Sequence, residues 1–429
     1  MPRQNHPLPD HNHHADRPRP TVLPRLLTSN GLDAASGTML DTVLDVVTVT
    51  VLGMSTTQLG LLNALGTISF LLLAVPLGSV ADARGATRVL PVVLTGKVAI
   101  LAATTALLAT GTLQPAALMV LVTALGVLTV AAENAQVSAV PLIEPDHGRI
   151  ATAVASLSAA DRVAGVVMPG ATGLLLAAVG ASRMLSVATV LAVLALVAAL
   201  GLRRSQPRQP EDSEKHVPGD DEADAPATRS SMLSGFHELT SDRLLLASVI
   251  LTTAGNMGLA IGDSVEAVLV LRRLELGAAY WGALGTVGAV SGLVAATVAP
   301  RIVRAVEARR IFAAGAIVQA LVAALPLASL LLPGAGAVLM IVFSALWSVT
   351  LTVTNIAAGS YLATAVDSAV VGRTAAASRT LAMGSVPLAA FLGGWLGDAA
   401  GLAAPLVVWP GLTLAAALGF VLLTRGQIE

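Results

Sequence analysis

Long apolar stretches, repeated along almost the whole chain, constrain its fold more than any other feature. Twelve such stretches follow one another, and residues 61 to 81, for example, carry no charge. A bilayer core about 30 Å thick is crossed by about 20 apolar residues in a helix. Since 55% of the residues are hydrophobic and only 12% are charged, a soluble globular protein is excluded.

The stretches predict membrane-spanning helices and not the strands of a β-barrel. Each stretch is continuously apolar and lacks the alternation of apolar and polar residues that barrel strands show over about ten residues. The predicted fold class is therefore an all-α membrane protein with twelve transmembrane helices. The expected spans are 26–51, 57–81, 89–111, 115–139, 150–178, 182–202, 243–271, 278–299, 310–332, 335–362, 372–397 and 403–424.

An internal repeat divides the chain into two six-helix bundles. One constant shift places Asp41 on Asp263 and Arg88 on Arg310, at matching points of the two halves. The segment between the halves is rich in Pro, Asp, Glu and Ser and cannot bury a core. We therefore expect two six-helix pseudo-repeats. The expected parts are a disordered tail (1–25), a first bundle (26–202), an acidic linker (203–242) and a second bundle (243–425).

Basic residues in the short loops predict the orientation. Loops on the side of the N-terminus hold eight of them, and loops on the other side hold three. Lys and Arg favour the cytoplasmic side, so both termini are expected in the cytoplasm of a multi-pass protein of the cell (inner) membrane. The eight are Arg84, Arg88, Arg149, Arg301, Arg304, Arg309, Arg310 and Arg373, and the three are Arg183, Arg272 and Arg273.

Composition also limits the chemistry that is available. The chain has no cysteine, which excludes disulfides and thiolate metal sites, and a net charge of −1 gives no basic face for nucleic acid. We find no set of metal ligands, no nucleophile triad and no phosphate-binding loop, so we expect no enzyme and no cofactor. His6, His11, His13 and His14 in the tail have the composition of a metal site, but a solvated tail is the favoured interpretation, with no metal bound.

The loop between the second and third expected spans carries a motif. It reads Gly78-Ser79-Val80-Ala81-Asp82-Ala83-Arg84-Gly85-Ala86-Thr87-Arg88. This resembles the signature loop G-x-x-x-D-R-x-G-R-[RK] of the major facilitator superfamily, with Gly78, Asp82 and Gly85 in register and the positive charge moved to Arg84 and Arg88. The resemblance implies a gating latch in which a carboxylate at a helix end pairs with an arginine or a helix N-terminus.

Within that superfamily, one stretch is similar to the multidrug, macrolide and enterobactin exporters. The shared features are Glu133 late in the fourth span, Pro141 before a cytoplasmic loop, and Pro169 with Gly173 in the fifth span. Other glycine positions of the fifth-span motif hold Met168 and Thr172. The resemblance implies a secondary active transporter that works by alternating access.

Acidic residues inside the spans are the strongest candidates for function. A charged residue at the centre of a spanning helix costs about 2.5 to 3.5 kcal/mol, so such residues are expected to face a cavity. Asp41 and Asp45 lie about 40° apart on a helix, with Asp33 about another 80° away, so that all three share one face. In the seventh span, Asp263 and Glu266 lie about 60° apart. Because the repeat equates Asp41 with Asp263, we expect both to line one central cavity.

Secondary candidates are Asp33 of the first span and polar residues of other spans. The latter are Asn134 beside Glu133, the neighbours Asp161 and Arg162, Asn256 and Arg379. We predict that Asp41, Asp45, Glu133, Asp263 and Glu266 carry protons or bind a cationic group of the substrate. The alternative interpretation is structural for Asp161-Arg162, Lys97 and Arg379, with Lys97 snorkelling or pairing and Asp33 a solvated gate residue.

Aromatic residues suggest an apolar cavity wall in the second half. Phe343, Trp347 and Tyr361 lie in the tenth span and could contact a drug-like substrate. Interfacial anchoring and core packing are the alternative interpretations.

Three functions remain open at this point. The favoured one is a monomeric exporter of small amphipathic or cationic compounds, such as a drug, an antibiotic or a siderophore, by proton antiport. The second is a proton-coupled importer of a small nutrient, and the third is a non-transporting membrane receptor. Export is favoured by the resemblance to the exporter group and by acidic residues in the spans with little basic compensation.

Overall fold

The computed structural model describes residues 22–144, 147–203, 239–240, 242–366 and 371–425. Within these residues the regular structure is helical. Most of the predicted tail and of the predicted acidic linker lies outside the described residues, as do the four tail histidines. The last four residues of the predicted tail are already helical, because the first helix begins at Val22.

Six long helices form the first half. Ser55 and Gln58 form a capping box at the start of the second helix, and Gly85, at φ 82°, makes the tight turn to the third. The helices are α1 (Val22–Thr50), α2 (Thr56–Arg84), α3 (Ala86–Ala109), α4 (Pro115–Ile143), α5 (His147–Val179) and α6 (Ala181–Arg203).

The second half repeats this plan with interrupted helices. Pro326 and Pro387 stand in the first turn after two of the breaks, where the missing N–H group costs nothing. The segments are α8 (Arg243–Val268), the π-turn η1 (Leu269–Arg273), α9 (Gly277–Ala305), α10 (Ala308–Ala323), α11 (Leu325–Leu331), the 3-10 turn η2 (Pro333–Ala335), α12 (Gly336–Ala365), α13 (Val371–Gly384), α14 (Val386–Ala400) and α15 (Ala403–Thr424).

The number of spans agrees with the prediction. Eleven described segments are long and apolar enough to cross a membrane, and α1, with 29 residues, is a further helix of spanning length. Its hydropathy is reduced by the three aspartates Asp33, Asp41 and Asp45. In the second half, α10 with α11 and α13 with α14 each make up one span.

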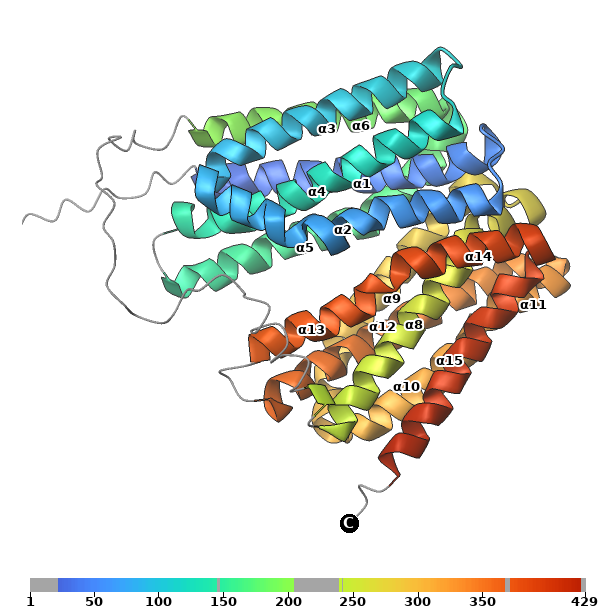
Figure 1. Ribbon diagram of the computed structural model, residues 1–429. Helices are drawn as coiled ribbons and strands as arrows, with labels where there is room; N and C mark the ends of the chain where they lie inside the picture. Colours follow the sequence, from blue (N-terminus) through green and yellow to red (C-terminus); the bar gives the residue numbers. More distant parts are fainter. Residues whose placement is uncertain (1–21, 145–146, 204–238, 241, 367–370, 426–429) are drawn as a thin grey trace, which may run out of the picture.

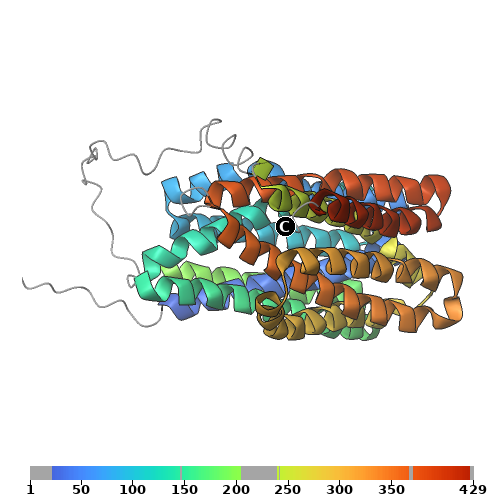
Figure 2. The same ribbon diagram turned by 90° about the horizontal axis from the view of Figure 1, so that it is seen from below.

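The two halves have the same packing plan. In the first half α1 packs on α5 and α6, and α4 packs on α2 and α3. In the second half α8 packs on α14 and α15, and α12 packs on α9 and α10. Seen from below, the helices of both halves run in broadly the same direction (Figure 2). The prediction of two six-helix pseudo-repeats is therefore confirmed.

The halves meet at one end of the molecule. We call the end at which α1 and α8 begin and α6 and α15 end the terminal end, and the other the opposite end. In Figure 1 the terminal end lies at the left for the first half and at the bottom for the second half. From the opposite end, the two groups of helices diverge toward the terminal end (Figure 1). The main contacts between the halves are made by α2 with α14 and by α5 with α9, which the repeat relates to each other.

Glycines allow these two contacts to be close. A Cβ atom on Gly60 of α2 would lie 3.0 Å from the Cα atom of Gly394 in α14. A Cβ atom on Gly173 of α5 would lie 2.8 Å from the Cα atom of Gly282 in α9. Backbone therefore touches backbone at both places, and the halves are sealed together near the opposite end.

Candidate functional site

A cavity of about 870 Å³ lies between the two halves. Its walls come from α1, α2, α3, α4 and α5 of the first half and from α8, α13 and α14 of the second. Among the described residues that line it are six carboxylates and a single basic residue, Lys97. The six are Asp33, Asp41, Asp45, Glu133, Asp161 and Asp263.

Three of the carboxylates lie in the part of the cavity where α1 faces α8. Asp41 and Asp263 line the cavity from opposite halves and are solvent-accessible within it. Asp45 lies one turn from Asp41 and accepts a hydrogen bond from Trp281 Nε1 of α9 at 3.2 Å. Asp45 also interacts electrostatically with Asp41 and Asp263. Asp41, Asp45 and Asp263 therefore line the same cavity at the junction of the two halves.

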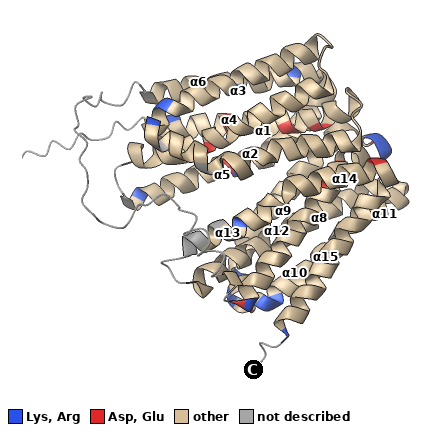
Figure 3. Cartoon of the chain, viewed as in Figure 1, with Lys and Arg blue, Asp and Glu red and all other residues tan. Residues whose placement is uncertain are grey.

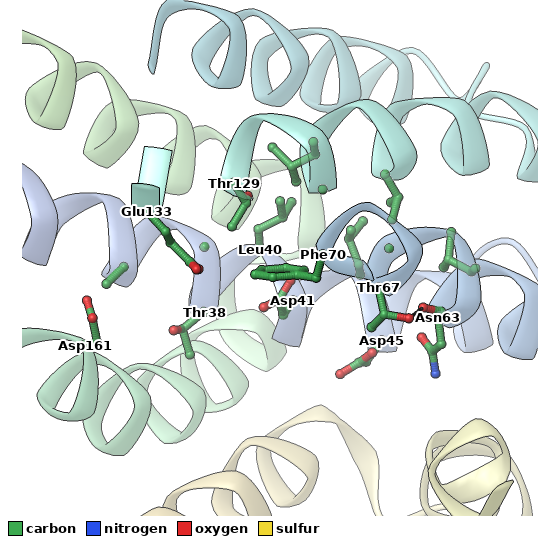
Figure 4. A pocket seen from close by; sticks show the side chains of 18 of the residues that line it. Thr38, Leu40, Asp41, Asp45, Asn63, Thr67, Phe70, Thr129, Glu133 and Asp161 are labelled. Atoms are coloured by element: carbon green, nitrogen blue, oxygen red, sulfur yellow. Dashed lines mark hydrogen bonds between the residues drawn. The ribbon is translucent and has the colours of Figure 1, made fainter. Parts of the chain in front are cut away.

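Glu133 and Asp161 face the cavity closer to the terminal end. Figure 4 shows the Glu133 side chain reaching in from α4, with Asp161 on α5 and Thr38 on α1 beyond it. Asp161 Oδ1 accepts a hydrogen bond from Asn30 Nδ2 at 2.8 Å, which fixes it at the level of the first turns of α1. Both carboxylates are exposed to the cavity.

Asp33 differs from the other described acids of the cavity because a lysine forms an ion pair with it. Lys97 Nζ of α3 lies 2.6 Å from Asp33 Oδ1, and the two side chains are only 7% and 9% exposed. Gln136 Nε2 of α4 donates to Asp33 Oδ2 at 3.4 Å. The expectation of a solvated gate residue at Asp33 is therefore wrong. Of the two alternatives for Lys97, pairing is the one that the structure shows.

The comparisons with known proteins decide the family. The model of the Major Facilitator Superfamily matches residues 26–382. The chain belongs to the major facilitator superfamily. It is therefore a membrane transporter of small molecules. No curated protein sequence matches the chain.

Solved structures of facilitator transporters share its fold. The nucleoside transporter NupG superposes with a TM-score of 0.74 at 14% identity, over 94% of this chain and 99% of that one. A POT family transporter in complex with 5-aminolevulinic acid gives 0.68 at 13% identity, over 96% and 97%. A bacterial homologue of the human lysosomal transporter Spinster, in an inward-facing and unoccupied conformation, gives 0.62 at 15%, over 94% and 96%.

The remaining predicted site residues lie around this facilitator cavity in different ways. Asn256 lines it and donates to the carbonyl of Ala382 at 3.2 Å. Asn134 donates to the carbonyl of Ala74 at 2.9 Å and so ties α4 to α2. Glu266 stands outside the lining and interacts electrostatically with Asp263 and Asp45. Arg162 and Arg379 are exposed and do not line the cavity either.

The three aromatic residues that were predicted to form a cavity wall do not line the cavity. Phe343 and Trp347 are buried in the second half, where both rings pack against Trp409, at centroid distances of 5.4 and 4.9 Å. Tyr361 donates a hydrogen bond to Asp242 Oδ2 at 2.8 Å, at the start of α8. Of the two interpretations, core packing fits these positions. Among the described residues, the aromatic side chain that lines the cavity is Phe70 of α2 (Figure 4).

The predicted gating loop lies at the terminal end. Arg84 and Arg88 are exposed there, and Gly85 makes the turn between α2 and α3. Gly78 packs near the Asn134 side chain. The side chain of Asp82 lies outside the described residues, so its pairing with an arginine or a helix N-terminus stays a prediction. Figure 3 shows basic residues at helix ends and acidic residues within the first half.

Neutral polar residues of the cavity escaped the sequence analysis. Asn63 and Thr67 of α2, Thr129 of α4 and Gln136 line the cavity, and Figure 4 labels the first three. Amides and hydroxyls inside apolar spans are a weaker signal than charges, because helices also use them for packing. The described residues hold no group of three or more His, Asp or Glu suited to a metal ion.

Proposed function

We propose that the chain exports small cationic or amphipathic compounds in exchange for protons. The observation that supports this most is the charge of the cavity: six carboxylates line it, and its one lysine is already paired with Asp33. Such a cavity attracts a positively charged group and repels an anion. The assignment to the exporters follows the resemblance around Glu133 to Gly173.

The lining also suits the apolar part of an amphipathic compound. Leu40, Leu44, Leu62, Leu125 and Phe70 lie between and beside the acids. An apolar pocket with a few polar groups is the common form of a small-molecule site. A substrate with a cationic group and an apolar body would therefore find both of its parts matched.

Protons and substrate would compete for the same carboxylates. Asp41, Asp45 and Asp263 are close enough to interact, so a bound proton or a cationic group of the substrate would relieve the repulsion between their like charges. Arrival of a cationic substrate would favour release of a proton, and protonation from the other side would favour release of the substrate. This competition couples export to a proton gradient.

The proposed movement is a rocking of α1–α6 against α8–α15. With the termini in the cytoplasm, as the basic loops predict, the present form is closed toward the outside and diverges toward the cytoplasm. It would be the form that collects substrate from inside the cell. The second form would close at the terminal end and open at the opposite end.

Dye efflux tests the proposal. Cells that make the protein should accumulate less ethidium than cells without it, and the difference should vanish when the proton gradient is dissipated. We expect Asp41→Asn and Glu133→Gln each to lower the gradient-dependent efflux about tenfold or more, because each removes a titratable group from the cavity.

Two controls accompany this experiment. Glu307→Gln is a matched change at an exposed carboxylate outside the cavity and should leave efflux unchanged. Asp41→Glu keeps the charge and should retain part of the activity. Full gradient-dependent efflux in both Asp41→Asn and Glu133→Gln would refute proton exchange at these residues. A broad panel of cationic dyes that accumulate equally with and without the protein would refute cation export.

A further inference from the structure

The short connection between α1 and α2 is held by the second half from both sides. It comprises residues 51–55 at the opposite end of the molecule, and we call it the α1–α2 hairpin loop. We propose that Asp398 and Arg272 clamp this loop and thereby set how readily the cavity opens at the opposite end. The clamp concerns the movement of the transporter and is independent of which substrate it carries.

Asp398 of α14 completes the capping of α2. Its Oδ1 atom accepts the N–H group of Thr56 at 3.1 Å, and its Oδ2 atom accepts that of Thr57 at 3.0 Å. The next N–H group, of Gln58, is accepted by the Ser55 hydroxyl at 3.3 Å within the first half. The first N–H groups of a helix lack partners inside it and carry partial positive charge. The first half thus provides the two reciprocal bonds of the capping box, in which the Ser55 N–H group also donates to Gln58 Oε1 at 3.0 Å, and the second half provides the carboxylate that accepts the N–H groups of Thr56 and Thr57.

The Thr56 hydroxyl strengthens the same contact. Its Oγ1 atom lies 2.7 Å from Asp398 Oδ1 and 2.8 Å from the carbonyl oxygen of Gly394, both in α14. The contact between Gly60 and Gly394 brings the two backbones close enough for these bonds. Separation of α2 from α14 would break all of them together.

Arg272 satisfies the other side of the loop. Its Nη2 atom donates to the carbonyl of Val49, in the last turn of α1, at 2.8 Å, and to that of Met54 at 3.3 Å. The carbonyls of Val47 and Thr48 accept N–H groups of the loop itself. A guanidinium group at a helix C-terminus is favoured because the last carbonyls carry partial negative charge. The second half therefore places a carboxylate at a helix start and a cation at a helix end.

The repeat-related contact lacks this arrangement. Between α5 and α9, Gly173 approaches Gly282, and Thr286 Oγ1 bonds to the Val166 carbonyl at 3.0 Å and to the N–H group of Gly170 at 2.9 Å. Among the described residues, the hydrogen bonds between α5 and α9 are made by neutral groups. Opening at the opposite end would therefore separate charged groups from their hydrogen-bond partners at the contact of α14 with α2. At the contact of α5 with α9 it would separate neutral groups.

A cysteine reporter in the cavity tests the clamp. Because the full-length chain has no cysteine, Asn63→Cys introduces a single thiol at a lining residue. Its reaction with a membrane-impermeant maleimide is measured from each side of the membrane, in intact cells and in inside-out vesicles. In this background Asp398→Asn should raise the labelling rate from the opposite-end side about tenfold, which corresponds to about 1.4 kcal/mol, and lower it from the terminal side.

Matched substitutions separate the clamp from general effects. Glu275→Gln removes an exposed carboxylate at the same end, and Arg273→Gln removes the arginine next to Arg272; both should leave labelling unchanged. Arg272→Gln should shift labelling in the same direction as Asp398→Asn, by about threefold, because Arg272 makes two hydrogen bonds to the first half where Asp398 makes three. Thr56→Val, which keeps the shape and removes the hydroxyl, should also act in this direction and serves if Asp398→Asn does not fold.

The decisive result is a pair of opposite changes: faster labelling from the opposite-end side and slower labelling from the terminal side. A purely structural role would loosen the protein and raise labelling from both sides. The proposal is overturned by that result, or by rates for Asp398→Asn and Thr56→Val that stay within twofold of the Glu275→Gln control.

Discussion

Two aspartates on one face of α1 have opposite surroundings. Asp33 is enclosed with Lys97 and Gln136, and each of its two carboxylate oxygens contacts one of these side chains of the first half. Asp41, two turns further along, opens to the cavity, and no described residue forms a hydrogen bond or ion pair with it. The same residue type on the same helix thus serves packing at one level and remains available to a cation or a proton at the other.

Asp161 and Asp45 fall between these extremes. Asp161 receives one hydrogen bond from Asn30, and Asp45 receives one from Trp281. Both keep further lone pairs for a ligand, since a carboxylate accepts about four hydrogen bonds. The depth of an acid in the membrane therefore does not distinguish Asp33 from the other acids. What distinguishes it is the ion pair with Lys97.

The largest expected effect concerns the stability of the enclosed pair. Asp33→Asn and Lys97→Met each leave one charge buried without its partner, which costs about 3 to 5 kcal/mol. We expect each variant to unfold at a clearly lower temperature in detergent. The measurement is the thermal unfolding curve of the purified protein.

The double variant is the control for this pair. Asp33→Asn with Lys97→Met removes both charges, and it should recover most of the lost stability, because a neutral pair of similar volume needs no compensation. Additive losses in the double variant would show that the two residues act independently, and the contrast with Asp41 would then lose its basis.

Much of the fold could be predicted because the hydropathy of the sequence determines where the membrane-spanning helices lie. Lengths of apolar sequence fix the spans, and the correspondence of Asp41 with Asp263 marks the repeat. The placing of Asp41, Asp45 and Asp263 in one cavity follows from the same logic, since a charge in a span needs water, a partner or a cavity.

What could not be predicted depends on contacts between helices. Asp33 pairs with a lysine 64 positions further along the chain, and nothing in α1 alone distinguishes it from Asp41. Phe343 and Trp347 pack on Trp409 because helix rotation turns them toward the interior of the second half. The partners of Asp398 lie more than 300 residues away in sequence. Periodicity gives the faces of a helix but not the neighbour that each face meets.

A smaller effect is expected at Asp45, which has one donor. Trp281→Phe removes the indole N–H group and keeps the apolar ring, so it should lower the free energy of unfolding by about 1 kcal/mol or less. Because Trp281 belongs to the second half and Asp45 to the first, transport should fall about two- to fivefold. The control is Trp395→Phe, at a side chain that is 50% exposed on the outer surface of α14 and should tolerate the change. Equal effects of the two substitutions would show that the hydrogen bond to Asp45 is unimportant.

The smallest change in stability is expected at Asp41, where the same substitution as at Asp33 can be made on the same helix. Asp41→Asn breaks no ion pair or hydrogen bond to a described residue, and it removes a negative charge that Asp45 repels and that Lys97 attracts. The free energy of unfolding should therefore stay within about 0.5 kcal/mol of the unsubstituted protein or rise, while gradient-dependent efflux is lost. Thermal unfolding of Asp33→Asn and Asp41→Asn, measured side by side, tests this directly. If Asp41→Asn were as unstable as Asp33→Asn, Asp41 would have a structural partner after all, and its loss of transport would report on folding and not on an acid kept free for its ligand.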